Sequence, residues 1–291
     1  MKDIIVIVGP TGIGKTKLSI ELAKKLDAEI INGDSVSIYK ELDIGSAKPT
    51  IEERENIPHH LIDIKDVEEE YSVYDYQKDV REKINEINNR GKRIIIVGGT
   101  GLYIKAALYD YNFTEGTTYN DYKDLSNEEL LAKIKSYNVE KVPEINNRRR
   151  LERLLNKLEN NEEISNNKDK LLYPIKVIGL TTDRDILYDR INKRVDKMID
   201  NGLLDEINSL KDKYNNSRIL NSGIGYKEFY DYLFNNKSLE DTINEIKQNS
   251  RRFAKRQYTF FNNQFQTSWF EVNLNSFNET INSVYNYIND N

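Results

Sequence analysis

The sequence has no cysteine and only two histidines, His59 and His60, among its 291 residues. Without cysteine there are no disulfides, no thiolate nucleophile and no cysteine-ligated zinc. Adjacent side chains on a strand point to opposite faces, so the two histidines are expected to be structural and not joint metal ligands. Any metal is therefore expected to be Mg²⁺ held by oxygen ligands.

Long apolar runs are also missing. No segment approaches the roughly 18 apolar residues of a transmembrane helix, and the first apolar run, 4–8, begins too early to follow a cleaved signal. A cytoplasmic protein with no membrane partner is expected. The formal net charge of −5 argues on average against a nucleic-acid partner. Two basic clusters, 148–153 and 251–256, nevertheless stand out, although each is by itself typical of a solvated helix face.

Short apolar, β-branched runs alternate with segments of helical periodicity. The expected strands are 4–8, 29–31, 61–64, 93–97, 175–180 and 269–272. The expected helices are 16–26, 73–89, 102–108, 184–201 and 239–261. This alternation predicts an α/β core with a mostly parallel sheet flanked by helices.

Residues 114–172 interrupt the alternation. They contain no convincing strand, and apolar residues such as Leu130, Ile134, Leu151 and Leu155 recur at helical spacing. The sequence therefore predicts a small helical insertion domain at 114–172 and a discontinuous core made of 1–113 and 173–291.

A P-loop pattern, G-x-x-x-x-G-K-[ST], follows the first expected strand and opens a helix. Its residues are Gly9, Pro10, Thr11, Gly12, Ile13, Gly14, Lys15 and Thr16. Its amides and the helix N-terminus attract phosphate oxygens, Lys15 can reach a terminal phosphate, and the Thr16 hydroxyl is a candidate Mg²⁺ ligand. The core is thus expected to be P-loop NTPase-like, with its phosphate donor undetermined.

Ligands of open α/β sheets bind beyond the carboxyl ends of the strands. Asp34 follows the second strand, as a carboxylate on the P-loop rim or as a helix cap. The fourth strand, 93–97, ends in a Gly-Gly-Thr-Gly turn that offers the Thr100 hydroxyl, where a P-loop ATPase usually has an acidic Mg²⁺ ligand. Asp63, after another apolar run, is an alternative for that acidic role.

A cationic face is expected on the helix that follows Asp183. Arg190, Arg194 and Lys197 recur at i, i+4 and i+7. Either one of these arginines leans over the phosphate site, or the helix is a surface helix with intrahelical ion pairs such as the one between Asp189 and Lys193.

In order along the chain, these segments resemble the tRNA dimethylallyltransferase family, also called tRNA isopentenyltransferases. The matching segments are GPTGIGKT (9–16), DSVSIY (34–39), DIGSAKP (43–49), PHHLID (58–63), YSVYDY (71–76), VGGTGLY (97–103), DRDILYDRINKRVD (183–196), GIGYKE (223–228) and AKRQYT (254–259). Because no cysteine is present for the zinc finger of eukaryotic relatives, the resemblance is to the bacterial type.

The resemblance implies transfer of a dimethylallyl group from dimethylallyl diphosphate to N6 of the adenosine immediately 3′ of the anticodon, in tRNAs that read codons beginning with U. It implies Asp34 as general base, and Arg194, Lys15 and Thr100 as further catalytic residues. The P-loop residues 9–16 and Arg194 would bind the diphosphate with Mg²⁺ on Thr16. A monomer is expected.

The resemblance also implies contacts with the tRNA anticodon arm. The residues concerned are Asp34, Ser35, Val36, Ser37, Thr100, Arg149, Arg150, Leu151, Glu152, Arg153, Arg251, Arg252, Lys255 and Arg256. Both basic clusters then become phosphate-positioning surfaces. The chain departs from the family pattern at Ser37, where many members have glutamine, and at Asn147 and Arg149, where many have aspartate and glutamine.

Two other functions are compatible with parts of the sequence. A P-loop kinase acting on a nucleotide or another small molecule needs only residues 9–16 and the cationic helix, and leaves the Gly-Gly-Thr-Gly turn unexplained. A nucleotide-gated RNA-binding switch usually carries an Asn-Lys-x-Asp element if it is guanine-specific, and the sequence has none.

Overall fold

The computed structural model describes residues 1–111, 120–139, 142–160 and 170–290. The chain forms two compact units, Met1–Tyr109 with Leu171–Asn291, and Asp110–Lys170. The second unit overlaps the predicted insertion at 114–172, of which residues 114–119, 140–141 and 161–169 lie outside the described ranges.

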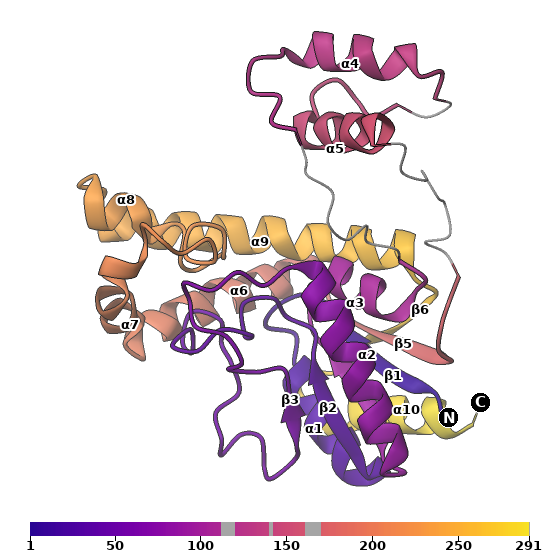
Figure 1. Ribbon diagram of the computed structural model, residues 1–291. Coiled ribbons are helices and arrows are strands. Elements are labelled where there is room, and N and C mark those ends of the chain that lie inside the picture. Colours follow the sequence, from indigo (N-terminus) through magenta and orange to yellow (C-terminus); the bar gives the residue numbers. More distant parts are fainter. Residues whose placement is uncertain (112–119, 140–141, 161–169, 291) are drawn as a thin grey trace. The chain divides into compact units, whose positions relative to one another are not determined.

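Six strands form one sheet in the order β3-β2-β4-β1-β5-β6 (Figure 1). The strands are β1 (Ile4–Val8), β2 (Ala28–Asn32), β3 (His59–His60), β4 (Arg93–Val97), β5 (Ile175–Thr181) and β6 (Thr267–Glu271). Every adjacent pair is parallel, which confirms the predicted sheet. Because β1 lies in the middle, the P-loop that follows it is placed at the centre of the sheet's carboxyl edge.

The prediction of a strand at 61–64 is wrong. The third strand is a two-residue edge strand, His59–His60, and the chain leaves the sheet directly after it. Leu61 and Asp63 have φ values of 61° and 58°, a left-handed conformation that cannot continue a strand. An apolar sequence pattern does not report this backbone reversal.

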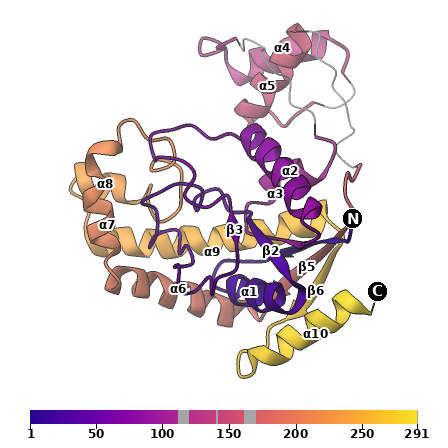
Figure 2. The same ribbon diagram turned by 60° about the horizontal axis from the view of Figure 1, so that its bottom comes forward.

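Alternate residues of β1 enter two different cores, one on each face of the sheet. Ile4, Val6 and Val8 pack with α2 (Val73–Asn89), α3 (Gly101–Leu108) and the long α9 (Leu239–Gln264). Ile5 and Ile7 pack with α1 (Lys15–Leu26) and α10 (Phe277–Asn289) on the opposite face (Figure 2). A strand buried on both faces explains the continuous apolar run at 4–8.

Helices α6 (Arg184–Asp200) and α9 lie side by side in both views (Figures 1 and 2). Two polar contacts join them: Arg251 Nη1 donates to Asn192 Oδ1 at 2.5 Å, and Lys247 pairs with Asp196 at 2.5 Å. Asp183 caps the start of helix α6, because its carboxylate accepts from the Asp185 and Ile186 amides.

The rest of this unit contains helices that the sequence pattern does not indicate. They are α7 (Leu203–Ser209), the short 3₁₀ helix Lys211–Lys213, α8 (Phe229–Phe234) and α10. The first three are at most seven residues long. Segments this short show too few turns for a helical period to stand out.

The described part of the insertion contains helices α4 (Asn127–Ser136) and α5 (Arg148–Glu159). Leu130 and Ile134 of α4 pack against Leu151 and Leu155 of α5 in a small core of their own, as the helical spacing predicts. Among the described residues, no helix combines the length and apolar character needed to cross a membrane.

Candidate active site

The P-loop turns sharply between β1 and α1. Gly14, the residue before α1, has φ 110°, and a Cβ there would lie 2.7 Å from the ring of Phe277. Only glycine accommodates both the left-handed backbone and this ring. Because α1 begins at Lys15, the amides of its first turn have no partner within the helix and are directed at the space where an anion binds.

Lys15 folds back on the P-loop. Its Nζ donates to the carbonyl oxygens of Gly9 and Pro10, each at 2.9 Å. Burial and then the nearby Arg194 charge lower the pKa of Lys15 from 10.5 to about 7, while Asp34 acts in the opposite direction. An anionic group that binds at the loop would therefore stabilise the charged form of Lys15 and raise its pKa.

The cations of α6 take different roles. Arg190 donates twice to the Gly12 carbonyl, at 3.1 and 3.0 Å, and so braces the P-loop. Arg194 makes no hydrogen bond or ion pair with any described residue, and its Cδ lies 3.9 Å from where a Cβ on Gly12 would be. Burial lowers the pKa of Arg194, and Asp34 and Glu53 oppose that shift. Arg194 is thus a half-buried guanidinium beside the P-loop whose donors are available to a ligand.

The alternative of a plain surface helix accounts for the other face of α6. The ion pair between Asp189 and Lys193, at 2.8 Å, is present there, and Lys197 is exposed.

The loops that follow β2 and β4 contact each other at Gly33 and Gly98. A Cβ on Gly98 would lie 2.1 Å from the Gly33 carbonyl carbon, so no other residue fits without parting the loops. The Gly33 amide donates to Val97 O at 2.7 Å, and the Ser35 amide donates to the Thr100 hydroxyl at 3.1 Å. This close contact fixes the β2 loop, with Asp34, against the Gly-Gly-Thr-Gly turn.

Asp34 caps no helix, so that alternative is wrong. Its Oδ1 accepts from the Val36 amide at 2.9 Å, and its own amide donates to Asn32 Oδ1 at 3.0 Å. These bonds form a tight turn that holds the carboxylate in place. Its Oδ2 accepts no hydrogen bond from the described residues, so this oxygen is available to a ligand, within electrostatic range of Lys15 and Arg194.

The candidate metal ligand Thr16 is exposed at the start of α1. The described residues contain no group of three or more acidic or histidine side chains that could hold a metal. A P-loop hydroxyl together with diphosphate oxygens and water nevertheless suits Mg²⁺, which uses few protein ligands.

The two histidines have structural positions. His60 Nε2 bonds Glu29 at 2.7 Å, and His59 Nδ1 bonds the Ile57 carbonyl at 2.8 Å.

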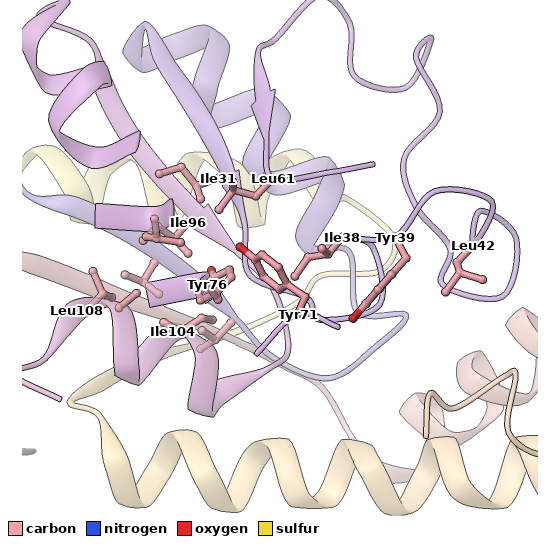
Figure 3. Packing of buried hydrophobic residues seen from close by; sticks show 14 of the residues in the cluster. Ile31, Ile38, Tyr39, Leu42, Leu61, Tyr71, Tyr76, Ile96, Ile104 and Leu108 are labelled. Atoms are coloured by element: carbon pink, nitrogen blue, oxygen red, sulfur yellow. The ribbon is translucent and has the colours of Figure 1, made fainter. Parts of the chain in front are cut away.

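A buried lysine explains why Asp63 is not a free acidic ligand. Lys48 Nζ donates to the Tyr39 carbonyl at 2.9 Å, to Asp43 at 2.6 Å and to Asp63, which Arg54 also contacts. These bonds tie the DIGSAKP segment to the PHHLID segment. Figure 3 shows Tyr39 near Tyr71, and both side chains belong to one hydrophobic core.

A second set of hydrogen bonds, here called the Glu206 clamp, joins the DIGSAKP segment to α7. Glu206 Oε2 accepts from the amides of Asp43 and Ile44, at 3.0 and 2.7 Å. Its Oε1 accepts from the Gly45 amide at 3.1 Å and from the Tyr226 hydroxyl at 2.8 Å. One carboxylate thereby satisfies three amides of the DIGSAKP segment and one residue of the GIGYKE segment. Tyr226 lies in the GIGYKE segment, whereas no motif segment contains Glu206, so the sequence pattern gives no signal for this carboxylate.

The basic cluster on α9 has an exposed side. Arg252, Lys255 and Arg256 are exposed and lie on one stripe of the helix, whereas Arg251 is partly buried against α6. Ser37, predicted to contact RNA, is only 6% exposed.

In the insertion, Arg149, Arg150 and Arg153 are exposed and pair with no described residue. Glu152 pairs with Arg148 at 2.8 Å. The prediction that Leu151 contacts RNA does not fit its position, because its side chain is fully buried in the core of the insertion. The periodicity of α5 already marked this position as apolar.

The pH dependence of stability is expected to reveal Lys15. Between pH 7 and 10.5 the unfolded chain keeps the Lys15 proton and the folded chain does not, so this group makes the free energy of unfolding rise with pH. Urea unfolding at several pH values within that window should show a steeper rise for the unaltered chain than for Lys15→Met. Parallel curves would contradict the lowered pKa.

The Glu206 clamp is expected to carry measurable stability. Glu206→Gln replaces one acceptor oxygen with a donor that faces N–H or O–H groups, so the free energy of unfolding should fall by about 2–3 kcal/mol. Asp205→Asn removes the same charge from the exposed neighbour and should change it little. Equal effects of the two variants in urea unfolding would show that only the charge matters.

Comparison with known proteins agrees with this geometry. The family model described as IPP transferase matches residues 37–264. A tRNA dimethylallyltransferase of Bacillus subtilis strain 168 is 48% identical over 288 residues, which cover 93% of this chain and 91% of that protein. One from Bacillus cereus is 46% identical over 286 residues, covering 93% of this chain and 90% of that protein.

Solved structures give the same result. A tRNA isopentenylpyrophosphate transferase from Staphylococcus epidermidis has a TM-score of 0.77 and 38% identity, covering 100% of this chain and 99% of that one. A eukaryotic dimethylallyltransferase acting on tRNA has a TM-score of 0.78 and 27% identity, covering 100% and 80%. The P-loop, the Asp34 turn and the family match together show that the chain belongs to the tRNA dimethylallyltransferase (IPP transferase) family.

Proposed function

We propose that this protein transfers the dimethylallyl group of dimethylallyl diphosphate to N6 of the adenosine immediately 3′ of the anticodon, in tRNAs that read codons beginning with U. The observation that carries the proposal is the meeting of three groups at the sheet's carboxyl edge. They are Asp34, with one carboxylate oxygen free, and the cations Lys15 and Arg194 beside the P-loop. Relatives named for this activity support it. None of the relatives named above is a kinase or a nucleotide-gated switch.

The chemistry needs a base on one side of the transferred carbon and positive charge on the other. The N6 lone pair attacks C1 of the prenyl group, the C1–O bond breaks, and its electron pair leaves with the diphosphate. N6 loses a proton in this step, and the free Oδ2 of Asp34 is the acceptor for it. Asp34 is held in its turn by Val36 and Asn32, so it is preorganised for this transfer.

Residues of the P-loop and of α6 would bind the leaving group, which is the diphosphate. Arg190 fixes the loop through Gly12, and Arg194 and Lys15 offer charge-assisted donors to diphosphate oxygens. Positive charge placed in advance stabilises the negative charge that develops on the departing oxygen. Thr16 would hold Mg²⁺, which would neutralise part of the diphosphate charge.

Binding of the anticodon arm would use the exposed cations of α5 and α9. Arg149, Arg150 and Arg153 have no competing partners among the described residues. The stripe of Arg252, Lys255 and Arg256 is likewise exposed. Such contacts place the RNA without reading its sequence. We propose that the protein acts as a monomer, because all the named groups lie on one chain. We propose that it is located in the cytoplasm, because tRNA is found there.

The proposal is tested by incubating the protein with unmodified tRNA, Mg²⁺ and dimethylallyl diphosphate, followed by nucleoside mass spectrometry. We expect a dimethylallyl mass gain on adenosine, none with ATP as donor, and a rate lower by about 10²–10⁴ in Asp34→Asn with tRNA affinity retained. Asp189→Asn, an exposed carboxylate on α6, is the matched control. ATP turnover without any prenyl transfer would reject the proposal.

The RNA contacts are tested by salt dependence. Arg150→Gln combined with Arg153→Gln should reduce the slope of log affinity against log salt by about 1.5–2, the effect of two phosphate contacts. Lys133→Gln with Lys135→Gln removes the same charge from exposed positions of α4 and should leave the slope unchanged. An equal change in both double variants would point to net charge rather than to contacts by α5.

A further inference from the structure

A buried glutamine in α9 has an unused hydrogen-bond acceptor. Gln257 is only 4% exposed, and its Nε2 donates to the Gly99 carbonyl at 3.1 Å. Its Oε1 is buried and has no hydrogen-bond partner among the described residues. A buried acceptor without a donor is costly and uncommon in folded proteins, so a donor from a ligand is the natural complement.

This amide lies beside the proposed base. A Cβ built on Gly99 would be 2.0 Å from Gln257 Nε2 and 3.9 Å from Asp34 Oδ2, so the amide and the carboxylate flank one point of the turn. The bond to the Gly99 carbonyl also settles the orientation of the amide, because that carbonyl requires the nitrogen as its donor. The oxygen is therefore the amide atom that has no partner among the described residues.

The two substrates of the proposed reaction differ in what they can donate. Dimethylallyl diphosphate is a hydrocarbon joined to an anion that offers acceptors only. An adenine amino group has two N–H bonds, and Asp34 takes the proton of one of them. We propose that Gln257 Oε1 accepts the second N6–H of the target adenosine, and so positions the nucleophile and selects adenine. This inference rests on the proposed function.

The assignment is consistent with the atoms of the reaction. N6 forms a bond to C1, C1–O breaks with its electrons on the diphosphate, and one proton passes from N6 to Asp34. The other N–H stays on the product nitrogen and keeps its bond to Gln257. Guanine or hypoxanthine would present an O6 acceptor to the same two oxygens, which disfavours those bases.

The test compares two anticodon stem-loops in the absence of prenyl donor, one with adenosine and one with purine riboside, which lacks the amino group, at the target position. The dissociation constants of the unaltered protein should favour adenosine. In Gln257→Met this preference should fall by about three- to tenfold, because one of the two acceptors is lost. Gln264→Met changes an exposed glutamine of the same helix and should keep the full preference.

Gln257→Glu is the conservative variant, since a protonated carboxyl group keeps one donor for the Gly99 carbonyl and one acceptor oxygen. Burial beside Asp34 raises the pKa of such a group. Its adenosine preference should therefore approach that of the unaltered protein at the same pH as the pH falls from about 8 to about 6. Gln257→Met should show no such recovery.

Three outcomes overturn the inference. They are an unchanged preference in Gln257→Met, equal weakening of both RNAs, which would mean that Gln257 only holds the turn, and no recovery in Gln257→Glu at low pH. Transfer by the unaltered protein is measured in parallel. Its absence would reject the proposed function, whereas normal transfer with an unchanged preference would reject only the role of Gln257.

Discussion

The site depends on the contact between the loops that follow β2 and β4. Gly33 and Gly98 lie so close that a Cβ on Gly98 would overlap the Gly33 backbone, and the Thr100 hydroxyl accepts from the Ser35 amide. Parallel neighbours in the sheet end at the same edge, so this contact follows from the strand order. It holds Asp34 in place before any substrate arrives, as the proposed role of Asp34 as the base requires.

Two basic side chains, Lys15 and Arg194, lie within electrostatic range of one carboxylate, Asp34, at this edge. Burial and then the nearby Arg194 charge lower the pKa of Lys15, burial lowers the pKa of Arg194, and Asp34 opposes both shifts. None of the three forms an ion pair with another within the described residues. A diphosphate would relieve the repulsion between the two cations, so the free site is arranged to favour an anionic ligand.

Several segments typical of the family serve the scaffold rather than the chemistry. Lys48 joins Asp43 to Asp63, and Glu206 joins the amides of 43–45 to Tyr226. The Lys48 bonds and the Glu206 bonds both restrain the DIGSAKP segment (43–49), which follows Asp34 in the chain. Residues of this kind carry no recognisable catalytic signature, because their role is set by partners distant in the sequence.

The sequence by itself determined the features that are local: the P-loop between a strand and a helix, the parallel sheet, and the helical insertion. It also placed Asp34 on the correct edge. Only the tertiary structure decided that Arg190 braces the loop while Arg194 bonds no other described residue, and that Leu151 is buried. It also turned the chain out of the sheet at Leu61. Spacing gives the face of a helix, whereas the partner of each side chain depends on segments far away in the chain.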